Sequence, residues 1–118
     1  GESARHVADN LDKFFEETDQ IPELICLTKL HPLDMSILMD SVKSTKKILI
    51  VEDGSKNFGI GSEILANIQE SSLNLDFALR VGAKPYPIPS VSSLEHKLLP
   101  VINVICTEFN NTFNQEYN

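Results

Sequence analysis

The segment Lys47–Asp53, KILIVED, limits the possible folds of this chain more than any other feature. Its apolar residues, from Ile48 to Val51, follow one another without a polar break. An unbroken run of this kind is typical of a parallel strand, because the crossover connections of parallel sheets place helices over both faces. The segment therefore predicts a strand at the centre of a parallel sheet, and with it an α/β fold.

The sequence before this strand alternates between helix and strand patterns. Apolar residues recur every three or four positions over 3–17, which predicts one amphipathic helix. The short apolar run 23–30 has the length of a buried strand. Asp34 can cap the next helix, and its spacing predicts an inner face of Ile37, Leu38, Met39 and Val42.

The sequence after the strand continues this alternation. Ser62 can cap a helix that starts after the glycines, and residues 75–81 alternate like a half-covered strand. Three prolines predict an ordered extended loop over 82–92, before a short helix at 93–99. Pro100 suits the first turn of a last helix with Val101, Val104, Ile105 and Phe109 inward. We expect one domain over residues 1–118, a three-layer αβα sandwich with a mostly parallel sheet.

Composition argues against several classes of partner and location. Ten Lys and Arg against 17 Asp and Glu give a net charge of −7, which disfavours binding to nucleic acid. The sequence contains no apolar run near the roughly 18 residues that span a membrane, and its first ten residues do not resemble a secretion signal. Cys26 and Cys106 lack a CxxC partner, so we expect two small buried side chains and neither a disulfide nor a zinc site.

The loop Gly59, Gly61 and Ser62 is the first candidate site. It lies between the predicted central strand and a helix start, where backbone amides of α/β proteins bind anions. The loop lacks the lysine of a phosphate-binding P-loop and the third glycine of a dinucleotide fingerprint. The alternative is a tight turn that leads into a capped helix.

Two acidic residues at the strand end, Glu52 and Asp53, are the second candidate, because paired carboxylates can bind a divalent metal or share a proton. ILIVED also resembles the first strand of a receiver domain. That family needs a second aspartate at the end of a later strand, and Asp76 is inside a predicted strand. The three histidines, His6, His31 and His96, are not placed beside a nucleophile by the sequence, and we expect surface or turn positions for them.

Three blocks of the sequence, LICLTKLHPLD, ILIVEDGSKNFGIGSEILANIQE and LRVGAKPYPIPSVSSLEHKLLP, together resemble the C-terminal domain of the transketolase superfamily. The resemblance is strongest to the β subunit of the decarboxylating component of 2-oxo acid dehydrogenase complexes. The residues that match the family motifs are Pro32, Leu33, Asp34, Glu52, Gly59, Gly61, Glu63, Ile64, Arg80, Val81, Pro87, Pro89, Leu94, Glu95 and Pro100. The chain departs from the motifs at Cys26, Thr28, Phe58 and Ala83–Pro85.

The resemblance implies a domain that assembles an enzyme and supplies no catalytic side chain or cofactor ligand of its own. In such enzymes thiamine diphosphate and magnesium lie between other domains. The implied partners are the domain that precedes this one in a longer subunit, the α subunit of an α2β2 tetramer, and the dihydrolipoyl acyltransferase core. The implied location is the bacterial cytoplasm or the mitochondrial matrix.

The resemblance further implies subunit contacts at Glu63 and on the proline loop, through Tyr86, Ile88 and Val91. For Glu63 the other interpretation is an acidic residue favoured by the helix dipole. For the loop it is that Tyr86 and Ile88 fold back onto the core of the domain. An alternative function is a non-catalytic binding or regulatory module of the same fold, with an anion bound at the loop from Gly59 to Gly61.

Overall fold

The computed structural model describes residues 2–27, 33–52, 59–82 and 101–117, with the side chains of residues 2–4, 101 and 115–117 excepted. The elements in chain order are α1 (Glu2–Asp9), α2 (Leu11–Thr18), α3 (Ser36–Thr45), β1 (Lys47–Glu52), α4 (Ile60–Glu70), β2 (Phe77–Gly82) and α6 (Val101–Tyr117). The chain divides into two compact units, Gly1–Pro22 with Lys84–Asn118, and Glu23–Ala83. The domain organisation over residues 1–118 stays a prediction.

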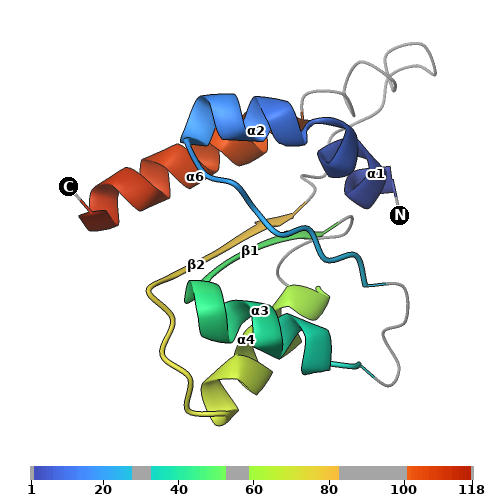
Figure 1. Ribbon diagram of the computed structural model, residues 1–118, viewed down its shortest axis with the longest axis vertical. Coiled ribbons are helices and arrows are strands. Elements are labelled where there is room, and N and C mark those ends of the chain that lie inside the picture. Colours follow the sequence, from blue (N-terminus) through green and yellow to red (C-terminus); the bar gives the residue numbers. More distant parts are fainter. Residues whose placement is uncertain (1, 28–32, 53–58, 83–100, 118) are drawn as a thin grey trace. The chain divides into compact units, whose positions relative to one another are not determined.

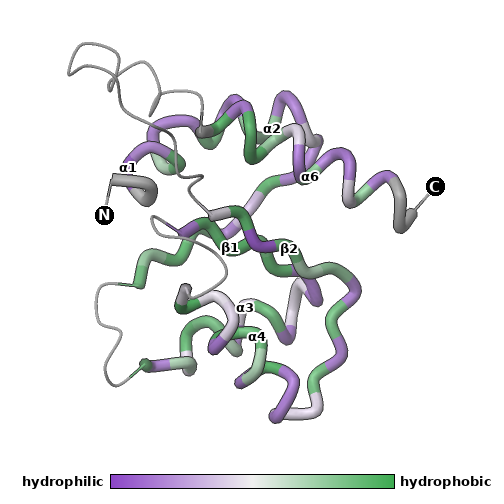
Figure 2. The backbone as a smooth tube through the Cα atoms, turned by 180° about the vertical axis from the view of Figure 1, so that it is seen from behind, coloured by the Kyte–Doolittle hydropathy of each residue, from purple (hydrophilic) through white to green (hydrophobic). Residues whose placement is uncertain are grey.

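The second unit contains the sheet. β1 pairs with β2 in parallel, with Lys47 opposite Phe77 and Glu52 opposite Gly82. Both strands are largely hydrophobic along their course (Figure 2). Parallel pairing flanked by helices confirms the α/β class and the strand predicted from KILIVED. Within the described residues β1 has one neighbouring strand, so its central position and the three-layer arrangement stay predictions.

Helices α3 and α4 pack on one face of this sheet (Figure 1). The core consists of Leu38 and Val42 from α3, Ile50 from β1, and Ile64 and Ile68 from α4. Alternate strand residues share a face, so Ile48, Ile50 and Glu52 lie on the face that these helices cover. The end of β1 therefore lies on the same side of the sheet as the start of α4.

The regular structure described in the first unit consists of helices. α2 lies alongside α6 (Figure 1), and Phe14 meets Phe109 edge to face with ring centroids 5.5 Å apart. Ile105 and Phe109, expected to point inward from the last helix, are buried, which confirms them. Ile102 and Cys106 are buried with them, and Val104 is half-buried.

The single helix expected over 3–17 is two helices, α1 and α2, which meet at Asn10. Asn10 has φ −121° and ψ 22°, and its side-chain amide donates to the carbonyl of His6 over 2.7 Å. Asparagine competes for backbone hydrogen bonds in this way, which explains the break. The apolar spacing continues across Asn10, so the periodicity did not reveal it.

The strand expected over 23–30 is wrong for residues 23–27, which are neither helix nor strand; residues 28–30 lie outside the described ranges. Cys26 is exposed, so its expected burial is also wrong, whereas Cys106 is buried as predicted. A short apolar run is a strand only when another strand pairs with it, and a single sequence does not show that pairing.

The helix expected after Asp34 is confirmed as α3, but its inner face is narrower than predicted. Leu38 and Val42 are buried and Met39 packs at the edge of the core, whereas Ile37 is 64% exposed. Ile37 precedes Leu38 by one residue, about 100° around the helix, so the two cannot share the same narrow face. None of the helices in the described ranges is long and apolar enough to cross a membrane.

Candidate functional site: the glycine loop and Glu52

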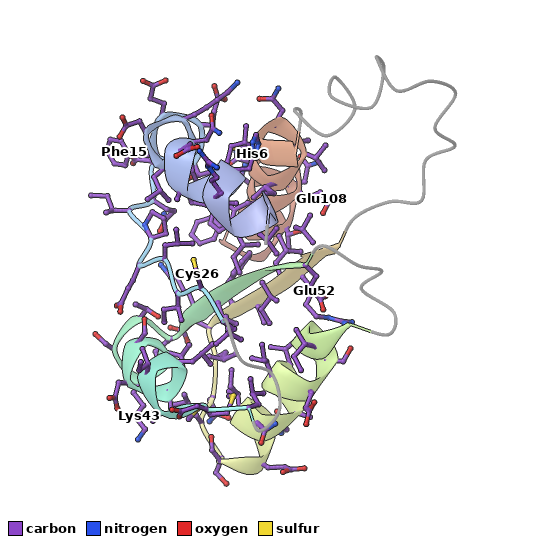
Figure 3. The ribbon with its side chains drawn as sticks, turned by 90° about the vertical axis from the view of Figure 1, so that its right-hand side faces the viewer. His6, Phe15, Cys26, Lys43, Glu52 and Glu108 are labelled. Carbon is purple, nitrogen blue, oxygen red and sulfur yellow. The ribbon has the colours of Figure 1, made fainter. Side chains whose placement is uncertain are left out.

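Glu52 is the last residue of β1, and its side chain is the one charged group buried among the described residues, at 7% exposure. It follows Ile48 and Ile50 on the face of the sheet that α3 and α4 cover. Figure 3 shows Glu52 at the end of β1, beside the start of α4. A carboxylate in such a place must be compensated by hydrogen-bond donors or positive charge.

The main compensation comes from Gly61. The backbone N–H of Gly61 donates to Oε1 of Glu52 over 2.8 Å. Gly61 is the second residue of α4, where a backbone N–H has no partner within the helix. The positive end of the helix dipole also favours a negative charge here. The other carboxylate oxygen, Oε2, is buried and accepts no hydrogen bond within the part of the chain that the structure describes.

The carboxyl group of Glu52 leaves no room for a side chain at Gly59 or Gly61. A Cβ atom added to Gly59 would lie 2.6 Å from Cδ of Glu52. A Cβ atom added to Gly61 would lie 2.9 Å from Oε2 of Glu52 and 3.1 Å from Cδ of Arg80. The φ of Gly59, −84°, is one that any residue adopts, so its backbone conformation does not demand glycine. The two glycines therefore serve the close approach of Glu52.

Ser62, the remaining residue of the predicted loop, and its neighbour Glu63 lie at the surface. α4 begins at Ile60 with Gly59 as its N-cap, so the expectation that Ser62 caps the helix is wrong. Ser62 instead accepts a hydrogen bond of 2.5 Å from Nη1 of Arg80, which ties α4 to β2. Glu63 is exposed in the first turn of α4, where the helix dipole favours an acidic residue.

Of the three histidines, His6 lies within the described residues. His6 lies on α1, and its Nε2 accepts a hydrogen bond from the backbone N–H of Ile102. Asp53, His31, His96, Tyr86, Ile88 and Val91 lie outside the described residues. Within the described ranges no three His, Cys, Asp or Glu side chains gather as metal ligands.

The contacts of this site hold the start of α4 against β1 and β2. A carboxylate from β1 satisfies a free amide of α4, and an arginine from β2 reaches the same turn. Sequence reasoning assigned Glu52 to a possible metal pair and missed its contact with Gly61. The information was present in the strand, because Glu52 has the same parity as Ile48 and Ile50 and must face the same core.

Comparison with known proteins identifies the family. Residues 3–105 match the model of the transketolase C-terminal domain. The pyruvate dehydrogenase E1 component subunit beta of Porphyra purpurea is 41% identical over 76 residues, 63% of this chain and 23% of the relative. The mitochondrial subunit beta of Ascaris suum is 39% identical over 98 residues, 80% of this chain and 26% of the relative. The human mitochondrial subunit is 35% identical over 95 residues, 78% of this chain and 26% of the relative.

These relatives are much longer than the chain, which spans about a quarter of their length. No solved structure matches this chain. The family match covers both units and includes Glu52, Gly59, Gly61 and Arg80. The chain therefore belongs to the transketolase C-terminal domain family, and its relatives include β subunits of pyruvate dehydrogenase E1.

Proposed function

We propose that this chain is the assembly domain at the C-terminal end of a β subunit, in a thiamine diphosphate-dependent 2-oxo acid dehydrogenase. The parent enzyme would decarboxylate a 2-oxo acid oxidatively and transfer the acyl group to lipoyl-lysine. The names of the relatives support pyruvate as the substrate class. The word mitochondrial in several of those names supports the mitochondrial matrix, with the bacterial cytoplasm as the alternative location.

The observation that supports an assembly role most is that polar residues of the family motifs contact other residues of this chain. Three residues that match the motifs, Glu52, Gly61 and Arg80, bond or crowd against one another or against Ser62 within the second unit. Glu52 is buried, so the carboxylate is not presented to a substrate at the surface. A motif used in this way fixes the start of a helix and gives a preorganised surface, which lowers the entropy lost on association.

The described residues do not fit a thiamine diphosphate site. A magnesium ion that bridges a diphosphate needs oxygen ligands that converge, and no such group is formed in the part of the chain that the structure describes. We therefore derive no reaction step within this chain. We propose that the cofactor lies between other domains of the enzyme, and calorimetric titration of the 118-residue chain with thiamine diphosphate and magnesium tests this. Micromolar binding that requires both would contradict the proposal.

For the partners we propose the preceding domain of the β subunit, the α subunit and a dihydrolipoyl acyltransferase. Glu63, exposed on the first turn of α4, is the described residue that we propose at a subunit contact. Tyr86, Ile88 and Val91 are proposed for the same role from the family resemblance alone. If Glu63→Gln lowers only the thermal stability and leaves assembly of the tetramer unchanged, Glu63 does not belong to the interface.

The direct test uses the full-length β subunit that contains this chain, produced with the α subunit encoded in the same genome. Native mass spectrometry of the purified complex should give the mass of an α2β2 tetramer. A β subunit that ends before this chain should leave the tetramer unformed while its remaining domain still unfolds cooperatively. A truncated subunit that still forms the tetramer would refute the assembly role.

The alternative function, an anion-binding module, uses the same loop. An anion at the amide of Gly61 would have to displace the carboxylate of Glu52, which accepts from that amide over 2.8 Å. Displacement would leave Oε1 of Glu52 without its hydrogen bond inside the protein, which costs free energy. The assembly role is therefore the better supported of the two.

A further inference from the structure

The N-terminus of α4 has three properties of an anion site. The N–H of Gly61, the second residue of an 11-residue helix, points at a carboxylate oxygen 2.8 Å away. The positive end of the helix dipole adds to its attraction for anions. The side chain of Arg80 adds a positive charge at the same turn, because its Nη1 donates a hydrogen bond to Ser62.

A second, independent observation concerns the group that fills this place. Glu52 is more than nine-tenths buried, and its Oε2 accepts no hydrogen bond within the described residues. A side chain selected only for packing at this position would be apolar, since a buried unpaired oxygen costs free energy. The carboxylate is therefore present for its charge and for the bond to Gly61.

We infer that the start of α4 is a carboxylate-binding site that the chain fills with its own Glu52, so that a small free carboxylate occupies it when the Glu52 side chain is shortened. The narrow space around the carboxyl group of Glu52 limits the ligand to a small carboxylate. The carboxyl group is flat, and a Cβ atom added at Gly59 or Gly61 would lie 3.1 Å or less from its atoms. Formate consists of the carboxylate group alone, so we expect it to bind better than acetate, which adds a methyl group, and better than tetrahedral phosphate. This inference does not depend on the assembly role.

The first experiment is rescue of Glu52→Ala in the 118-residue chain. The variant should unfold roughly 5 to 15 °C below the natural chain, since it loses a charged hydrogen-bond acceptor. Formate should restore part of this loss in a saturable manner, with a dissociation constant no tighter than about 1 mM for so small a ligand. Sodium chloride and phosphate at equal ionic strength should restore none of it.

A matched control separates this site from general salt effects. Glu63→Ala also removes a carboxylate near this site, but from an exposed side chain on the first turn of α4. Formate should not raise the unfolding temperature of Glu63→Ala or of the natural chain more than chloride does. Equal gains in all three proteins would overturn the inference. If Glu52→Ala is unfolded without additive, formate should refold it and chloride should not, and failure of formate to refold it would equally overturn the inference.

A double-mutant cycle tests the same space without any ligand. Gly59→Ala places a methyl group where the carboxyl group of Glu52 lies. It should lower the unfolding temperature in the natural chain and have little effect in Glu52→Ala, because the space is then empty. Equal losses in both backgrounds would show that Gly59 is required for another reason, and would overturn the proposed site.

Discussion

The backbone N–H of Ile102 donates a hydrogen bond of 3.2 Å to Nε2 of His6, a residue 96 positions earlier in the chain. Ile102 is the second residue of α6, where a helix leaves its amides unpaired. The imidazole of His6 therefore acts as the cap of a helix from the other end of the sequence. The bond also explains why the side chain, expected at a surface or turn, is half-buried.

Replacing His6 with Ala should reduce the free energy of unfolding by about 0.5 to 1.5 kcal/mol, because the amide of Ile102 loses its acceptor. Urea denaturation of the 118-residue chain measures this loss. Arg5→Ala changes the exposed neighbour on the same helix and should leave the free energy of unfolding nearly unchanged. Equal losses in the two variants would mean that the cap contributes nothing.

Replacing Phe109 with Ala should cost about 3 to 5 kcal/mol, the range for a large aromatic residue in a core. Phe109 is 5% exposed, and it meets Phe14 edge to face and stacks on Phe113 at 5.2 Å. Phe15 is 44% exposed, so Phe15→Ala is the matched control and should cost much less. Similar losses in the two variants would contradict the packing of α2 and α6.

Asp34 should stabilise α3 in a manner that depends on pH. Its Oδ1 accepts from the N–H and the hydroxyl of Ser36, and these bonds lower the pKa of Asp34 below 3.8. A lowered pKa in the folded state gives stability that is present above the unfolded value and lost as the pH falls through the folded value. The unfolding temperature of Asp34→Asn should therefore be below that of the natural chain at pH 6. The difference should shrink as the pH falls below 3.8, and a constant difference would contradict the role of the charge.

The two cysteines should differ in their reaction with a thiol reagent. Cys26 is exposed, whereas burial and the charge of Glu17 raise the pKa of Cys106, against a smaller lowering effect of Lys13. Less thiolate and less access both slow the reaction of Cys106. One thiol should react rapidly at pH 8 and the second only after unfolding. Cys26→Ser should abolish the rapid phase, and a rapid phase that persists would contradict this assignment.

Secondary structure and buried positions that follow from the local spacing of apolar residues were predictable. The segment KILIVED predicted strand β1, because a continuous apolar run in an α/β pattern is typical of a buried strand. Helical spacing predicted the burial of Leu38 and Val42. Contacts between distant residues were not predictable in this way. The bond of Glu52 to Gly61 and the cap of His6 on Ile102 each depend on which group meets an unpaired amide in space. The break at Asn10 depends on a local bond from its side-chain amide to the carbonyl of His6, which the spacing of apolar residues does not reveal.

The resemblance to a family supplied what periodicity could not, since the motif residues Glu52, Gly59, Gly61 and Arg80 meet in one place. It did not predict why they do so. The glycines looked like an anion loop because such loops precede helices in many α/β proteins, and the anion in this structure is a side chain of the chain itself.

The most direct test of the assembly role is a chimera. The segment of the Ascaris suum β subunit that matches this chain over 98 residues is replaced by the chain, and the product is made with the Ascaris suum α subunit. The chimera should form a tetramer of two α and two β subunits, measured by native mass spectrometry, and should decarboxylate pyruvate with added thiamine diphosphate and magnesium. A chimera that unfolds cooperatively, as a folded protein does, yet stays separate from the α subunit would contradict the proposal.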